Sequence, residues 1–204
     1  MKLKDVKRNF LITTAMELFL SQGIEKVTIK DIAVKAGVGE MTIYRYFGKK
    51  QNIVLEAMMQ LQDIVFNEYF KLDISSSGYH QLEMFYATFL NVFNTHNEFY
   101  RFLREFDLYM LEEDNESLQQ YEDELSRFKD GYLNAYQLGI QDGSVKPVDD
   151  IELFYFTTTH ALLELCKKLS SFKTVLPQDE KIEKGAEIAC LIKIILNKVI
   201  NSSN

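Results

Sequence analysis

The chain has 204 residues, a formal net charge of −7, and 47% hydrophobic against 26% charged residues. This length accommodates one or two domains with their own cores, and the ordinary composition excludes a disordered or fibrous chain. No apolar run reaches the roughly 18 uncharged residues that a membrane span needs. The residues after Met1 lack the apolar core of a signal peptide. We therefore expect a cytoplasmic protein with no membrane partner.

The negative net charge is unevenly distributed along the chain. Residues 1–50 hold ten lysines and arginines against five acidic residues, a net charge of +5, which leaves −12 for the remaining 154 residues. A basic segment attracts phosphate, whereas an acidic one is repelled by it. The pattern indicates an N-terminal part that binds nucleic acid and a larger part that stays off it.

Helix signals dominate the chain. It has only two prolines, Pro147 and Pro177, and long stretches repeat apolar residues at helical spacing. The pattern predicts an all-α fold. A first helix is expected over residues 4–22, ended by Gly23, because glycine adopts the left-handed conformation that closes many helices. Further helices are expected over residues 52–72, 79–96, 98–111, 116–141, 149–171 and 178–201.

Residues 28–47 predict a helix, a tight turn and a second helix. Thr28 is placed to cap the first helix, and Asp31 completes an acidic capping box three residues later. Ala33 is small enough for a close helix crossing, and Gly37 permits the sharp turn. The second helix then has an outward face that suits a DNA major groove. This face is expected to carry Gly39, Glu40, Met41, Thr42, Tyr44 and Arg45.

The same segment resembles a known family. Over residues 8–55 the chain is similar to the N-terminal signature of the TetR family of bacterial regulators. The resemblance implies a three-helix DNA-binding head with a helix-turn-helix at residues 1–50, and a larger helical ligand-binding and dimerisation domain at residues 51–204. The alternative is a short helical hairpin inside an ordinary core. The residues that carry the resemblance are Leu18-Phe19, Gly23, Thr28, Ile32-Ala33, Ala36-Gly37-Val38, Thr42-Ile43-Tyr44-Arg45-Tyr46-Phe47 and Lys50.

The resemblance also assigns roles to single residues. Where the family usually has Ser-x-Gly, this chain has Gly39-Glu40-Met41. Glu40 either accepts a hydrogen bond from cytosine or stabilises the start of its helix, and both remain open. Lys30 and Lys49 are expected to add phosphate contacts. The resemblance implies DNA backbone contacts by Thr28, Tyr44, Tyr46 and Lys50, and places Gly39, Glu40, Met41, Thr42 and Arg45 nearest the base edges.

The C-terminal part holds most of the chain's phenylalanines and tyrosines. Rings with a few interior polar groups are typical of a pocket for an apolar or aromatic small molecule, although many rings can be plain core. Glu105 and Asp107 would suit a lipophilic cation, whereas Arg101 and Arg104 would suit a carboxylate, and both remain open. The expected pocket residues are Tyr86, Phe89, Phe93, Phe106, Tyr109 and Tyr132, with His96, Arg104 and His160 as polar contacts.

Sequence signals for catalysis, cofactors or metal ions are missing. His80, His96 and His160 fall in separate predicted helices without metal-ligand spacing, and no serine or cysteine has a local catalytic signature. The segment Gly37-Val38-Gly39 begins like a dinucleotide-binding motif but lacks the third glycine and the preceding strand. We therefore expect no enzymatic activity, no cofactor and no metal ion.

The last two predicted helices carry broad apolar faces. Because one monomer cannot easily bury both, we expect a two-fold four-helix dimer interface, with an intramolecular core as the alternative. The hypothesis is a homodimeric repressor that binds a palindromic operator in double-stranded DNA and is released by a small-molecule effector. The alternatives are a DNA-binding regulator without such a ligand, and a helical lipophile carrier or enzyme. The apolar faces consist of Ile151, Phe154, Tyr155, Leu162, Leu165, Leu169, Ile182, Ala186, Ala189, Ile192, Leu196 and Val199.

Overall fold

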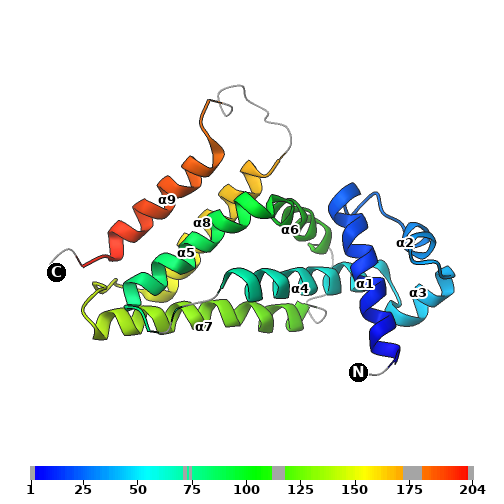
Figure 1. The fold of residues 1–204 in the computed structure, drawn as a ribbon, viewed down its shortest axis with the longest axis horizontal. Helices are drawn as coiled ribbons and strands as arrows, with labels where there is room; N and C mark the ends of the chain where they lie inside the picture. The colour runs from blue at the N-terminus through cyan, green and yellow to red at the C-terminus, as the bar shows by residue number, and fades with distance from the viewer. Residues whose placement is uncertain (1–2, 71–72, 74, 112–117, 172–180, 202–204) are drawn as a thin grey trace. The chain divides into compact units, whose positions relative to one another are not determined.

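The computed structural model describes residues 3–70, 73, 75–111, 118–171 and 181–201, and these form a series of helices joined by turns (Figure 1). The all-α prediction is confirmed. Within the described ranges no β-strand occurs, and one isolated antiparallel bridge pairs Val145 with Ile200. The helices are α1 (Leu3–Gln22), α2 (Ile29–Ala36), α3 (Glu40–Phe47), α4 (Lys50–Tyr69), α5 (Gly78–Thr95), α6 (Asn97–Met110), α7 (Gln119–Gln141), α8 (Ile151–Leu169) and α9 (Lys184–Val199).

The contacts between residues divide the chain into two compact units. The first unit takes residues 1–64 and 101–122, and the second takes residues 65–100 and 123–204. Helices α4, α6 and α7 therefore each contribute residues to both units. The predicted boundary between residues 50 and 51 stays a prediction, but the first unit contains segments from well beyond it.

The first unit is organised around α1. Its Leu11 and Ala15 are fully buried, and α1 packs on α2, which packs on α3. The ring of Phe19 stacks on that of Phe102 from α6, with centroids 6.2 Å apart. Gly23 follows α1 with a φ of 92°, in the left-handed region that was predicted for this position. The short helices α2 and α3 thus rest on a core that α1 and α6 share.

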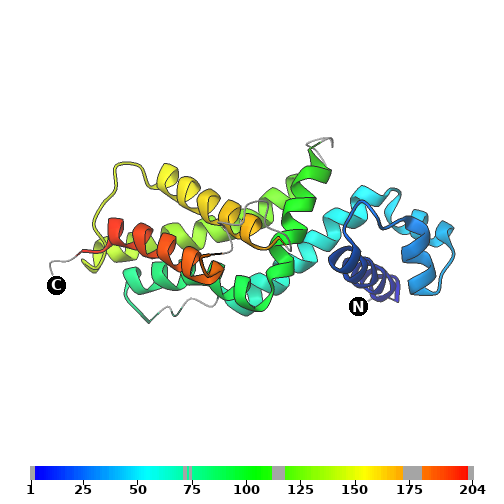
Figure 2. The ribbon, with the colours of Figure 1, turned by 90° about the horizontal axis from the view of Figure 1, so that it is seen from above.

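In the second unit α5, α8 and α9 pack side by side. Figure 2 shows α8, in yellow and orange, next to α9, in red. Leu82, Leu162 and Val199, one from each helix, are fully buried. Helix α7 meets the start of α5 at two glycines: a Cβ placed on Gly78 would lie 2.0 Å from the backbone nitrogen of Gly139. The two helices therefore approach at a point where no side chain fits.

Several helix ends differ from those predicted. Helix α4 begins at Lys50, two residues earlier than expected. Helix α9 begins at Lys184 because the Glu183 carboxylate caps it, accepting hydrogen bonds from the backbone N–H groups of Gly185 and Ala186. The predicted helical residues 71–72, 116–117 and 178–180 lie outside the described residues.

The predicted dimer faces of α8 and α9 need a correction. Several of their apolar residues are buried within a single chain, because α9 packs on both α5 and α8. The intramolecular alternative therefore holds for Tyr155, Leu162, Leu169, Ile192, Leu196 and Val199. Three residues of the predicted faces, Ile182, Ala186 and Ala189, are exposed instead. Leu153, Phe156 and Ile194, which were not predicted, are exposed on the same two helices.

Candidate nucleic-acid interface

Helix α2 is capped at both ends. At its start the Thr28 hydroxyl accepts a hydrogen bond from the Asp31 backbone N–H at 3.2 Å. The Asp31 carboxylate accepts from the Thr28 backbone N–H at 2.8 Å and from its hydroxyl at 2.6 Å, and these bonds hold the pKa of Asp31 below its ordinary value. At its end Gly37 adopts a φ of 66° and donates to the carbonyls of Ala33 and Val34. The predicted capping box and glycine turn are both present.

Helix α3 buries one side and exposes the other. Ile43 is fully buried and Phe47 is 5% exposed, and these two side chains determine which way the helix faces. On the opposite side Met41 is 79% exposed. We call the outward side the recognition face. It consists of Gly39, Glu40, Met41, Tyr44 and Arg45, which are exposed, and Thr42, which is half-buried.

The start of α3 carries no side-chain cap. Gly39 occupies the capping position in an extended conformation without a side-chain hydrogen bond. Glu40 is the acidic residue of the first turn, where a negative charge stabilises the positive end of the helix dipole. This position is compatible with the stabilising role predicted for Glu40. Its role toward cytosine stays a prediction.

Several basic residues lie in the segments around α3. Lys30 at the start of α2 and Lys49 just after α3 are exposed, as Thr28 is. Lys35 is also exposed, but its ammonium pairs with the Glu17 carboxylate at 2.8 Å. Exposed ammonium groups on long stems can follow a phosphate backbone.

Lys50, unlike these exposed lysines, is bound within the unit by the backbone of Ile24, which follows α1. The Lys50 ammonium donates to the Ile24 carbonyl at 2.5 Å and lies 5.3 Å from the centre of the Tyr109 ring. The Ile24 backbone N–H donates to the Glu105 carboxylate at 2.7 Å. Partial burial lowers the pKa of Lys50. The Ile24 carbonyl therefore occupies one of the three N–H donors of Lys50, and a phosphate contact by this residue stays a prediction.

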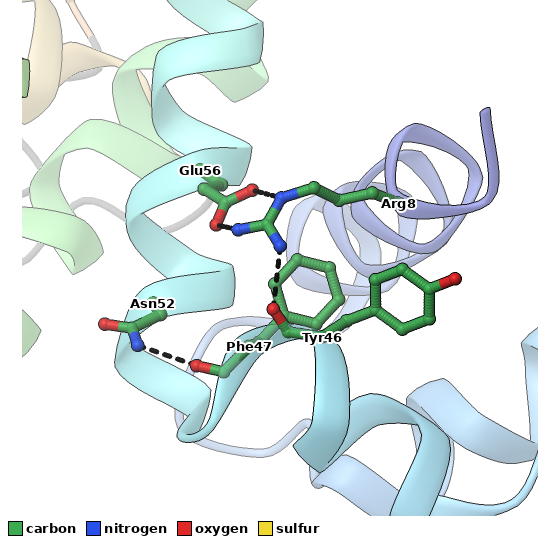
Figure 3. Close-up of polar contacts among 5 residues, drawn as sticks. All are labelled: Arg8, Tyr46, Phe47, Asn52 and Glu56. Atoms are coloured by element: carbon green, nitrogen blue, oxygen red, sulfur yellow. Dashed lines mark hydrogen bonds and ion pairs between the residues drawn. The ribbon is translucent and has the colours of Figure 1, made fainter. Parts of the chain in front are cut away.

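The end of α3 is bound by side chains that sequence reasoning missed. The backbone carbonyl of Tyr46 accepts a hydrogen bond from Arg8 Nη1 at 2.7 Å, and that of Phe47 accepts from Asn52 Nδ2 at 2.7 Å (Figure 3). The Arg8 guanidinium also pairs with the Glu56 carboxylate. Arg8 lies in α1 and the other two in α4, so no local pattern around α3 announces these contacts.

The residues predicted to bind an effector fall into two groups. Arg104, Phe106 and Tyr109 belong to the first unit, and the others belong to the second unit. Arg104 and His160 are exposed, so neither lies in the interior of its unit. Their contact with an effector stays a prediction. The members in the second unit are Tyr86, Phe89, Phe93, His96, Tyr132 and His160.

The interior of the second unit contains hydroxyl groups among aromatic rings. Tyr86 and Tyr132 are fully buried, and the Tyr86 hydroxyl donates to that of Tyr132 at 3.1 Å. It also shares a hydrogen bond of 2.8 Å with the hydroxyl of Thr158. The ring of Phe85 meets that of Tyr132 edge-on, with centroids 5.1 Å apart. The second unit therefore has a polar point inside an aromatic cluster.

Comparison with known proteins identifies the family of this helix-turn-helix. Residues 11–57, which contain the capped α2, the turn and α3, match the family model described as bacterial regulatory proteins of the tetR family. The chain is a TetR-family transcriptional regulator. The TetR-family resemblance predicted over residues 8–55 is thus confirmed.

Curated relatives of this TetR-family regulator carry the name of a repressor. The HTH-type transcriptional repressor KstR2 of Mycolicibacterium smegmatis is 28% identical over 155 residues, covering 73% of this chain and 72% of the relative. KstR2 of Rhodococcus jostii is 24% identical over 155 residues and covers 74% of each chain. The similarity thus extends well beyond the helix-turn-helix.

Solved structures share the fold of this TetR-family regulator along nearly its whole length. A ketosteroid transcriptional regulator, KstR2 of Mycobacterium tuberculosis, aligns with a TM-score of 0.65 at 17% identity, covering 96% of this chain and 95% of that one. A tetR-family regulatory protein from Rhodococcus RHA1 aligns with a TM-score of 0.69 at 14% identity, covering 97% and 98%. Among the described residues, no helix has the length and apolar character of a membrane span.

Proposed function

We propose that this regulator binds a palindromic operator as a homodimer, with α3 of each protomer in a major groove of the DNA. The recognition face carries this proposal, because α2 is capped and the buried Ile43 and Phe47 of α3 leave Arg45, Tyr44 and Met41 facing outward. Arginine reads guanine, and apolar groups contact the thymine methyl. The proposed contacts are Thr28, Lys30, Gly39, Glu40, Met41, Thr42, Tyr44, Arg45, Tyr46, Lys49 and Lys50.

The homodimer is supported by the exposed apolar side chains of α8 and of the segment that includes α9. Leu153 and Phe156 are 63% and 42% exposed, and Ile182 and Ile194 are 58% and 62% exposed. Exposed apolar side chains on two neighbouring helices suit an association surface. A second copy of the chain would cover them, and two heads related by a two-fold axis would match the two halves of a palindrome.

Repression is the proposed mode of regulation, and a small molecule is the proposed signal. The named curated relatives are repressors. The aromatic cluster around Tyr86, Tyr132 and Thr158 supports an apolar or aromatic effector, because its hydroxyls supply hydrogen bonds in apolar surroundings. An effector that prefers a conformer unable to bind DNA would draw the population away from the operator.

The DNA-binding proposal is tested with the purified full chain and the DNA upstream of its own gene, at two salt concentrations. Replacing Arg45 by alanine should weaken specific binding by about 1–3 kcal/mol and relax specificity at one base pair. Lys146→Ala is the matched control, since it removes an exposed positive charge from the second unit. Equal affinity of the Arg45→Ala variant and the wild type for the operator would contradict the proposed recognition face.

The effector proposal is tested against a regulator without a small-molecule ligand. Apolar and aromatic compounds are screened for a rise in the thermal unfolding midpoint, and each hit is titrated into the protein–operator complex. A true effector stabilises the free protein and lowers operator affinity, because the two ligands are thermodynamically linked. A hit that leaves operator affinity unchanged at saturation is not an effector. If no compound class raises the thermal unfolding midpoint, the alternative of a regulator without a small-molecule ligand is favoured.

A further inference from the structure

Arg8 joins three helices of the first unit. From α1 its Nε donates to Glu56 Oε2 at 2.9 Å, its Nη2 pairs with Glu56 Oε1, and its Nη1 donates to the Tyr46 carbonyl at 2.7 Å. Its guanidinium carbon lies 4.7 Å from the centre of the Phe47 ring. Figure 3 shows the guanidinium between the carboxylate on α4 and the end of α3. One side chain thus binds both the recognition helix and the helix that follows it.

The end of α3 depends on such partners. A helix of eight residues is too short to be stable alone, and its last carbonyls have no intrahelical donor. The Tyr44 carbonyl accepts from the Gly48 N–H at 2.8 Å, while those of Tyr46 and Phe47 are bound by Arg8 and Asn52. A guanidinium also stabilises the negative end of the helix dipole. Arg8 therefore restrains the position of α3 as well as satisfying its backbone.

The geometry requires an arginine and a carboxylate. The planar guanidinium binds the two Glu56 oxygens and the Tyr46 carbonyl with three different nitrogens, which a lysine ammonium cannot reproduce in the same plane. The Arg8 and Glu56 side chains are 37% and 24% exposed. A partly exposed pair adds little to overall stability. Its larger effect is on geometry, because recognition of base edges tolerates errors of only about 0.5 Å.

We propose that Arg8 and Glu56 are positioning residues for operator recognition: they hold the end of α3 against α4, so that specific DNA binding depends on a pair that does not touch DNA. This inference rests on the proposed operator binding. It also makes α4 part of the recognition apparatus, since the Glu56 carboxylate orients the guanidinium that holds the Tyr46 carbonyl.

The test compares specific and non-specific DNA binding of three variants. Wild-type protein first selects an operator from random duplex DNA. Dissociation constants are then measured for this operator and for a scrambled duplex of equal length. Glu56→Gln removes the charge that orients Arg8, and Arg8→Lys keeps the positive charge but not the planar geometry. Glu17→Gln is the matched control, because it also removes one carboxylate from an ion pair of the first unit, with Lys35.

Glu56→Gln and Arg8→Lys should each weaken operator binding about tenfold, the equivalent of one charge-assisted hydrogen bond. Binding to the scrambled duplex should stay within about twofold, because non-specific affinity depends on phosphate contacts. Glu17→Gln should bind both duplexes within about twofold of the wild type. Thermal unfolding confirms that each variant is folded. If Glu56→Gln does not fold, Glu56→Asp, which keeps the charge and shortens the reach, should show the same selective loss.

Four results would overturn the inference. Unchanged operator binding by Glu56→Gln would show that recognition does not depend on the pair. Tighter binding would mean that the released Arg8 contacts DNA directly. Wild-type behaviour of Arg8→Lys would show that the planar geometry is unnecessary. Equal losses on operator and scrambled DNA would identify a phosphate contact instead of a positioning role. Failure of the wild type to select any sequence would instead refute the proposed operator binding, so the two failures are distinguishable.

Discussion

At the scale of single residues, the buried tyrosines make the free energy of unfolding depend on pH in the alkaline range. Burial raises the pKa of Tyr86 to about 12 and that of Tyr155 to about 12. In the unfolded chain a tyrosine ionises near pH 10. Because the folded pKa is the higher one, the stabilisation is fully present below about pH 10 and is lost as pH rises through about 12.

The free energy of unfolding should therefore be insensitive to these groups up to about pH 10. It should then fall by up to about 1.4 kcal/mol per pH unit for each shifted tyrosine. Denaturant unfolding at a series of pH values measures this, and absorbance at the phenolate band reports ionisation. Tyr86→Phe removes one titrating group and should show a shallower loss. Ionisation of all tyrosines near pH 10 in the folded protein would contradict the prediction.

At the scale of elements, the crossing of α5 and α7 depends on two glycines. A Cβ on Gly78 would lie 2.0 Å from the Gly139 nitrogen and 2.5 Å from the Ala135 carbonyl oxygen, both backbone atoms that cannot rotate away. Gly78→Ala should therefore force α5 and α7 apart and cost about 3 kcal/mol or more, as severe overpacking does. Thermal or denaturant unfolding measures the loss.

Gly185→Ala is the matched control for this substitution. Its nearest neighbour is the flexible Glu183 side chain at 3.1 Å, and alanine favours a helix over glycine. Its stability should change by less than about 1 kcal/mol. A Gly78→Ala protein as stable as Gly185→Ala would show that the two helices do not meet as closely as described.

The same scale explains which elements could be predicted from the sequence. Helices α2 and α3 follow from local signals, namely the Thr28 and Asp31 capping pair and the glycine at position 37. The contact between Arg8 and Glu56 spans 48 residues, and both residues look like ordinary charges on amphipathic helices. Periodicity also showed that α8 and α9 have apolar faces, but it could not show that α5 would cover much of them. Nonlocal partners carry no signal in the pattern of one segment.

At the scale of the whole molecule, the proposed dimer makes operator binding depend on concentration. Ile194 on α9 is 62% exposed, so a charge there should disturb an interface more than the fold of one chain. Ile194→Glu should shift the protein toward monomers and weaken binding to a two-half-site operator by at least about tenfold, because one head must then bind without the other. Sedimentation and operator titration measure the two effects.

Leu125→Glu provides the comparison for this variant. Leu125 is a 40% exposed apolar residue on α7, so it tests the same change of chemistry on a different helix. Leu125→Glu should keep the wild-type oligomeric state and operator affinity. A dimeric Ile194→Glu protein would place the interface elsewhere, and a monomeric wild type would refute the dimer.

The backbone of Ile24 limits where this protein can be cut into fragments that fold. Its N–H is bound by Glu105 of α6 and its carbonyl by Lys50 at the start of α4, while Phe19 stacks on Phe102, again from α6. A fragment cut after residue 64 would keep the whole helix-turn-helix yet lose both α6 partners, leaving a backbone donor unpaired and a large ring uncovered. The DNA-binding head is therefore not a transplantable module. Grafting it onto another regulator would require the part of α6 that contains Phe102 and Glu105 to be carried along.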